Sequence, residues 1–159
     1  MKLPNLKYKM MGRTLEGTIF EIVFVVLAIA LWCYIAWLIG HAPSVIPTHF
    51  DAAGRADDWG SPVSTVFPCL MITVCGACML LAAYFPGSIS LPMKVENPMQ
   101  IALAMRMARI VSLVMLLITL AIALSMLTSF GAKGWIIGGP MGILIAVVIV
   151  FTILIYRAR

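Results

Sequence analysis

Four long apolar segments constrain the fold of this chain more than any other feature. They cover residues 18–40, 63–85, 107–130 and 135–156. A helix rises 1.5 Å per residue, so about 20 residues cross a hydrocarbon core of about 30 Å. The chain is 63% hydrophobic and 11% charged, whereas soluble domains are about 45–50% apolar and about 25% charged. We therefore predict an all-α, polytopic membrane protein, a single domain (1–159) built as a bundle of four transmembrane helices.

The basic residues predict the orientation of these helices. Of the 11 Lys and Arg residues, all but Arg55 and Lys133 precede the first span, follow the last, or lie in the connector 86–106 and the helix start beyond it. Cytoplasmic loops of membrane proteins carry an excess of Lys and Arg. We therefore expect a multi-pass protein of the bacterial cell membrane, with both termini in the cytoplasm and the loop 41–62 outside.

Proline and glycine mark the ends of the later helices. Asn97-Pro98 is typical of a cap followed by a first helical residue, so the third helix is expected to run from Pro98 to Phe130. Gly138-Gly139-Pro140 lies inside the fourth apolar run. The fourth helix therefore either starts near Trp135 and kinks, or begins only at Pro140.

The outer loop 41–62 concentrates the polar residues of the chain. It contains both histidines and three of the six acidic residues. Asp51 and Gly54 favour a tight turn, because Asp can accept hydrogen bonds from its own backbone and Gly accepts positive φ. Ser61-Pro62 suits a helix start. We therefore expect the loop to be ordered.

The same loop carries a family resemblance. Pro43, the run Ile46-Pro47-Thr48-His49-Phe50, Gly54, Asp57 and Trp59 follow directly on a first membrane span. This pattern resembles the amino-terminal domain of unknown function of bacterial SdpI-type immunity proteins, over roughly the first half of the chain. The resemblance implies a recognition role for the loop. The candidate recognition residues are Pro47, Thr48, His49, Phe50, Gly54, Asp57 and Trp59.

A second interpretation of the loop is a metal site. Imidazole and carboxylate groups can together bind a divalent cation. The weak candidates are His41, His49, Asp51, Asp57 and Asp58. A solvated loop and a partner-binding surface are the alternatives, and we expect no cofactor.

Glu21 and Arg109 lie inside the apolar runs, and Arg106 lies directly before the third run. Thr18-x-x-Glu21 has capping-box spacing, and Glu21 is otherwise expected to pair with Arg106 or Arg109. An intramembrane carboxylate is also a candidate for ion or proton coupling. Arg106 and Arg109 lie where long cationic side chains reach the interface, and phosphate or lipid headgroups are possible ligands there.

The second apolar run contains Cys75-x-x-Cys78. Residues three apart on a helix share a face but are poorly placed for a disulfide, and no nearby ligands complete a zinc site. Cys75, Gly76 and Cys78 are small. We therefore interpret them as a close helix contact.

The search for catalytic motifs finds none, so we expect no enzymatic activity. The sequence has no G-x-S-x-G, no H-E-x-x-H and no phosphate-binding glycine loop. No nucleic-acid motif accompanies the net charge of +5, so we expect none as a partner. Three hypotheses remain: a recognition, accessory or immunity-type protein that meets a peptide or another membrane protein through its loop, a small transporter or channel, or a structural subunit. All three share the lipid bilayer as partner, and the oligomeric state stays open.

Overall fold

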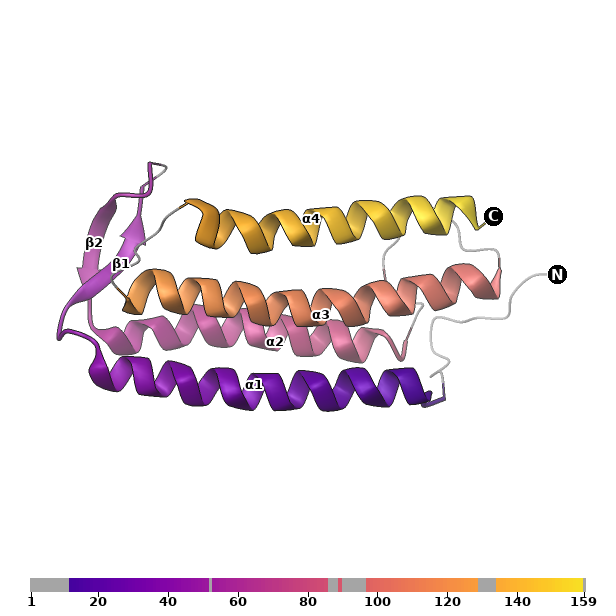
Figure 1. Cartoon of the computed structure of the whole chain (residues 1–159), viewed down its shortest axis with the longest axis horizontal. Coiled ribbons are helices and arrows are strands. Elements are labelled where there is room, and N and C mark those ends of the chain that lie inside the picture. Colours follow the sequence, from indigo (N-terminus) through magenta and orange to yellow (C-terminus); the bar gives the residue numbers. More distant parts are fainter. Residues whose placement is uncertain (1–11, 52, 86–88, 90–96, 129–133, 159) are drawn as a thin grey trace.

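The computed structural model describes residues 12–51, 53–85, 89, 97–128 and 134–158. Within these ranges, four helices are long and apolar enough to cross a membrane (Figure 1), which confirms the predicted bundle of a multi-pass membrane protein. The helices are α1 (Leu15–His41), α2 (Val66–Ala82), α3 (Pro98–Leu127) and α4 (Gly134–Arg157).

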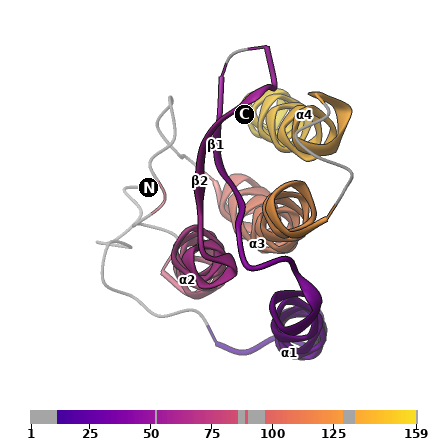
Figure 2. The same ribbon diagram turned by 90° about the vertical axis from the view of Figure 1, so that its left-hand side faces the viewer.

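Helix α3 occupies the centre of the bundle. It contacts each of the other three helices, and Figure 2 shows it between them in the end-on view. In an apolar 18-residue stretch of α3, 56% of the residues are buried, whereas only 6% are buried in the corresponding stretch of α4. The apolar outer faces of α1, α2 and α4 are thus left for lipid, as expected for helices in a bilayer.

Gly76 allows α1, α2 and α3 to meet closely. A Cβ atom added to Gly76 would lie 3.0 Å from Met115 Cβ and 3.1 Å from the carbonyl oxygen of Ser112, both on α3. It would also lie 3.3 Å from Phe24 Cε2 on α1. The prediction of a small-residue contact on α2 is therefore correct at this glycine.

The neighbouring cysteines do not share this contact, and that part of the prediction is wrong. Cys75 and Cys78 are exposed on the outer surface of α2, because they lie on either side of the face that Gly76 presents to α3. Cys69 is the buried cysteine, with its thiol 3.8 Å from the carbonyl oxygen of Thr119. All four cysteines are free.

Helix α1 begins one turn earlier than expected. Thr14 is its N-cap, and the Thr14 hydroxyl accepts a hydrogen bond from the backbone N–H of Gly17 at 3.0 Å. The predicted capping box from Thr18 to Glu21 is therefore wrong. Thr18 already lies inside the helix and donates its hydroxyl to the carbonyl oxygen of Thr14.

The other helix ends follow their turn residues. Asn97 caps α3 as predicted, in a capping box with Gln100, while α3 ends at Leu127 with Thr128 as its C-cap. Phe130, the predicted end, lies outside the described residues, as does most of the connector 86–106 before Asn97. Ser61 caps the short 3-10 helix η2 (Pro62–Thr65), which leads into α2. Helix α4 starts at Gly134 and continues through Pro140.

The loop 41–62 is ordered, and it contains a β-hairpin that the sequence analysis did not predict. Strands β1 (Ile46–Phe50) and β2 (Ala56–Gly60) pair antiparallel and lie across one end of the bundle (Figure 2). Ile46 is 2% exposed and belongs to a core cluster with α1 and α3. The hairpin is therefore docked onto the helices. The start of α1 and the end of α4 lie at the opposite end (Figure 1).

Candidate functional site

The hairpin brings the seven predicted recognition residues into one small structure. Four lie on β1, two on β2, and Gly54 lies in the turn between the strands. Pro47 pairs with Trp59, and His49 pairs with Asp58. The register shifts on both sides of His49, so the ladder is irregular at this histidine.

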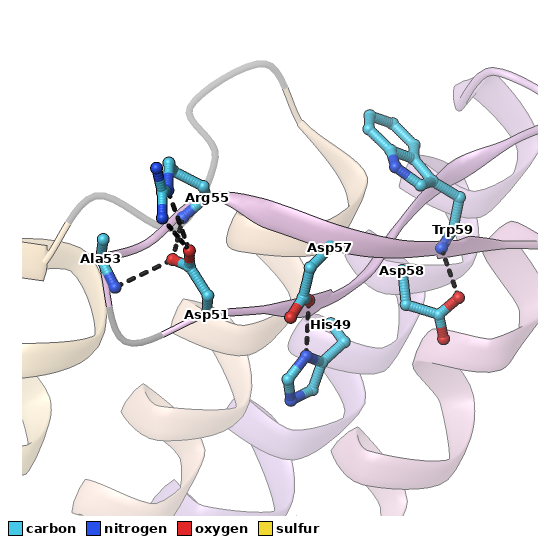
Figure 3. Close-up of polar contacts among 7 residues, drawn as sticks. All are labelled: His49, Asp51, Ala53, Arg55, Asp57, Asp58 and Trp59. Atoms are coloured by element: carbon cyan, nitrogen blue, oxygen red, sulfur yellow. Dashed lines mark hydrogen bonds and ion pairs between the residues drawn. The ribbon is translucent and has the colours of Figure 1, made fainter.

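Asp51 closes the turn of the hairpin. Its carboxylate accepts hydrogen bonds from the backbone N–H groups of Ala53 and Arg55 and from the Arg55 guanidinium, each at 2.9 Å (Figure 3). The backbone N–H of Arg55, followed by its side chain and the N–H of Ala53, holds the pKa of Asp51 below its ordinary value, against a smaller opposing effect of desolvation. Gly54 has φ of 76°, which favours glycine in the turn.

His49 and Asp57 form the exposed polar contact of the hairpin. His49 Nδ1 lies 2.6 Å from Asp57 Oδ1, and Figure 3 shows the two side chains pointing toward each other from neighbouring strands. Their side chains are 67% and 47% exposed. Nδ1 is engaged in this contact, and Nε2 has no hydrogen-bond partner among the residues that the structure describes. The contact thus fixes an imidazole whose second nitrogen can meet a partner.

A small cavity lies between the hairpin and the helices. Its volume is about 260 Å³, and Thr48, His49 and Phe50 form its wall on β1. Residues of α3 and α4 form the rest: Ile122, Ser125, Met126 and Ile137. Small-molecule sites usually measure about 300–1,000 Å³. This cavity is smaller, so it suits a single side chain of a partner better than a whole small molecule.

Trp59 lies apart from the His49–Asp57 contact. Its ring points away from that pair in Figure 3. The reason is the pairing of the strands, which sets Trp59 opposite Pro47. The Trp59 backbone N–H donates to Asp58 Oδ1 at 2.8 Å. The Trp59 side chain is 59% exposed and therefore free to contact lipid or a partner.

The five weak metal candidates do not gather. His41 Nδ1 lies 2.8 Å from the carbonyl oxygen of Trp37, near the end of α1. Asp51 is engaged by the turn and Asp58 by its neighbour, which leaves the two-residue contact of His49 with Asp57. Among the described residues, no three His, Cys, Asp or Glu side chains are close enough to hold a metal ion.

Charged side chains form a second cluster at the other end of the bundle. Glu16 accepts three hydrogen bonds from Arg106: Nε lies 2.9 Å from Oε1 and 3.2 Å from Oε2, and Nη2 lies 3.0 Å from Oε2. Arg109 Nη1 lies 3.9 Å from Glu16 Oε1, and Arg109 is 3% exposed. The predicted pairing of Glu21 with these arginines is wrong. Glu21 instead contacts Arg13, at 3.3 Å.

Glu16 was not predicted as a charged partner, because it lies before the first predicted span, which begins at residue 18. The available signal was spacing. Thr14 can cap a helix that starts at Leu15, and Glu16 then falls in the first turn, where a carboxylate is favoured by the helix dipole. The guanidinium of Arg109 packs beside Gly17, where an added Cβ would lie 2.8 Å from Arg109 Nη2. Gly17 therefore leaves the space that this buried arginine needs.

A contiguous part of the chain contains the hairpin and parts of the two helices beside it, and this part matches a known domain family. Residues 26–73 match the domain of unknown function DUF1648. The DUF1648 region begins within α1, includes β1, the turn and β2, and ends within α2. No curated protein and no solved structure matches the chain. The match therefore supports the presence of this domain and assigns no biochemical activity to it.

Proposed function

We propose that this protein is a recognition protein of the bacterial cell membrane, of accessory or immunity type, which binds a peptide or another membrane protein through its hairpin. Both termini are then cytoplasmic and the hairpin faces outward, as the distribution of Lys and Arg favours. The protein is not an enzyme in this proposal. The resemblance of the hairpin sequence to SdpI-type immunity proteins supports the same role.

The observation that carries the proposal is the exposed His49–Asp57 contact beside the cavity of the hairpin. Two polar side chains are held at 2.6 Å although both are largely open to solvent. The docked hairpin is a fixed scaffold for them, and binding residues are commonly presented on loops that a rigid scaffold positions. A prearranged contact loses less conformational entropy when a partner binds.

A transporter or channel has weaker support. Such a protein lines a path with polar groups inside the membrane. Ser112, Thr119 and Ser125 are the buried hydroxyl residues of α3, and each donates to a carbonyl oxygen of α3 itself. Helix α4 is continuous at Pro140, so it lacks the break that transporters use for binding.

The experiment is a survival assay on cells that produce the protein and are challenged with membrane-active peptides. Asp57→Asn and His49→Ala should abolish protection at normal abundance in the membrane, because the first removes the charge beside the imidazole and the second removes the imidazole itself. Asp58→Asn is the matched control, since Asp58 is an exposed carboxylate of the same strand whose one hydrogen bond among the described residues is accepted from the backbone N–H of Trp59. It should protect like the unmodified protein.

Two results would count against recognition by the hairpin. One is full protection by both Asp57→Asn and His49→Ala. The other is an equal loss in Asp58→Asn, which would indicate a general effect of charge on the hairpin. Abundance is measured by immunoblot of membranes for every variant, so that a folding defect is recognised as such.

A further inference from the structure

A groove lies between α1 and α2 at the end of the bundle away from the hairpin. Its volume is about 520 Å³, within the usual range for binding sites of about 300–1,000 Å³. Val25 of α1 and Leu80 and Leu81 of α2 form its apolar walls. Val25 is 53% exposed and Leu81 is 63% exposed, so this side of the groove opens toward the membrane.

The polar end of the same groove holds charges of both signs. Glu21 and Arg13 line it together with Tyr84, and the Arg13 Nη2 atom lies 3.3 Å from Glu21 Oε2. The Arg13 side chain is 77% exposed, whereas that of Glu21 is 22% exposed. Glu21 lies six residues into α1, about 9 Å along the helix from Leu15. The ion pair therefore lies just inside the helix end, near the depth expected of lipid headgroups.

Two polar atoms at this end lack a partner. Glu21 Oε1 and the hydroxyl oxygen of Tyr84 are buried, and neither has a hydrogen bond in the described part of the chain. Buried polar groups in proteins are nearly always hydrogen-bonded, so each such atom calls for an explanation. The carboxylate requires a donor, and its present contact with Arg13 is a long one to an exposed side chain.

We propose that this groove binds one phospholipid whose headgroup carries an ammonium group with an N–H donor, of the phosphatidylethanolamine type. The ammonium donates to the Glu21 carboxylate in place of Arg13, and Arg13 and Tyr84 donate to the phosphate. An acyl chain lies along Val25 and Leu81. The zwitterionic headgroup matches the two charges of the groove, and the exposed Arg13 side chain can give way to the ammonium at Glu21.

A second groove provides an internal comparison. It lies between α3 and α4, measures about 500 Å³, and is lined by apolar residues and glycine: Leu117, Leu120, Ala121, Leu124, Trp135, Ile136, Gly139, Pro140 and Ile143. Such a groove can hold acyl chains, and none of its described lining residues is charged. Any headgroup preference of the protein should therefore depend on Glu21.

The test is competition among lipids for the full-length protein, read by native mass spectrometry. Phosphatidylethanolamine, its N,N-dimethyl derivative and phosphatidylcholine, all with the same acyl chains, carry the same charges but three, one and no N–H donors. We expect the first two to be retained about tenfold better than phosphatidylcholine, because one hydrogen bond to a charged group changes affinity by roughly that factor. Equal retention of all three lipids would overturn the proposal.

Substitutions in the protein test which residue causes the preference for lipids with an N–H donor. Glu21→Gln should lower it severalfold, because a neutral amide oxygen accepts a weaker hydrogen bond from the ammonium N–H than a carboxylate does, whereas Tyr84→Phe should weaken all three lipids alike. Asp58→Asn, a carboxylate change at the hairpin, should leave the tenfold preference intact. An undiminished preference in Glu21→Gln would refute the assignment, as would stronger binding of phosphatidylglycerol, because an anionic lipid would then be bound through Arg13 alone.

Discussion

Gly76→Ala is the sharpest test of how the helices pack. The added methyl group would lie 3.0 Å from Met115 Cβ and 3.1 Å from the Ser112 carbonyl oxygen, whereas ordinary contacts of this kind measure 3.4–4 Å. Helix α3 must therefore move by a few tenths of an ångström. Overpacking of a close contact costs about 1–3 kcal/mol, while alanine gains up to about 1 kcal/mol over glycine in helix propensity.

Gly142→Ala is the matched control because it receives the same propensity gain without a clash. Gly142 lies within α4, and no atom lies within 4 Å of a Cβ added there. We expect the free energy of unfolding of Gly76→Ala to be about 1–3 kcal/mol below that of Gly142→Ala. Reversible unfolding in mixed micelles with increasing sodium dodecyl sulfate, followed by circular dichroism, measures the difference. Equal unfolding midpoints would refute the close contact of α2 with α3.

Three further predictions concern other parts of the chain. Gln100→Leu should lower the free energy of unfolding by about 1–3 kcal/mol, because Gln100 Nε2 donates to the buried carbonyl oxygen of Ile155 at 3.0 Å; detergent unfolding without a loss would contradict this. Carbon NMR should show that the Asp51 carboxyl titrates below its ordinary pKa of about 3.9. Its contribution to hairpin stability is therefore complete above about pH 3.9, the pKa of the group in the unfolded chain, and is lost as the pH falls through the lower pKa of the folded protein. In a cysteine-free background, a cysteine at Ala53 should react with an impermeant reagent on intact cells and one at Ala158 only after permeabilisation, and the reverse pattern would invert the proposed topology.

The sequence predicts the helices well because a bilayer imposes their length and polarity. Helix starts at Pro98 and Pro62 could be read from cap residues, since Asn97 and Ser61 satisfy free backbone N–H groups. Whether the fourth helix starts before Pro140 or at Pro140 could not be read from the sequence. A proline is tolerated inside a membrane helix when its surroundings compensate, and a local pattern does not report those surroundings.

The candidate site is less predictable because it depends on pairing between strands. Pro47 within a short run argues against a strand, yet proline is acceptable at the edge of a two-stranded sheet. The loop position of His49 and Asp57 was readable, but their contact at 2.6 Å depends on the register shifts beside His49. Likewise, the partner of Arg106 depends on where α1 begins. Because α1 begins at Leu15, about one turn earlier than predicted, Glu16 lies within the helix and pairs with Arg106 in place of Glu21.

The hairpin depends on residues outside the DUF1648 region. Ile46 of β1 packs in a cluster that includes Leu127, which lies on α3 beyond residue 73 and is 6% exposed. Leu127→Ala should therefore loosen the hairpin, because shortening a buried leucine costs about 2–5 kcal/mol and leaves a cavity beneath β1. Leu117→Ala, on the same helix at a 46% exposed position, is the matched control. Hydrogen exchange of residues 46–60, read by mass spectrometry, should be faster in Leu127→Ala than in Leu117→Ala. Identical exchange would mean that the hairpin holds its shape without α3. Faster exchange would mean that α3 holds the hairpin in place, so that the proposed recognition surface depends on residues beyond the DUF1648 region.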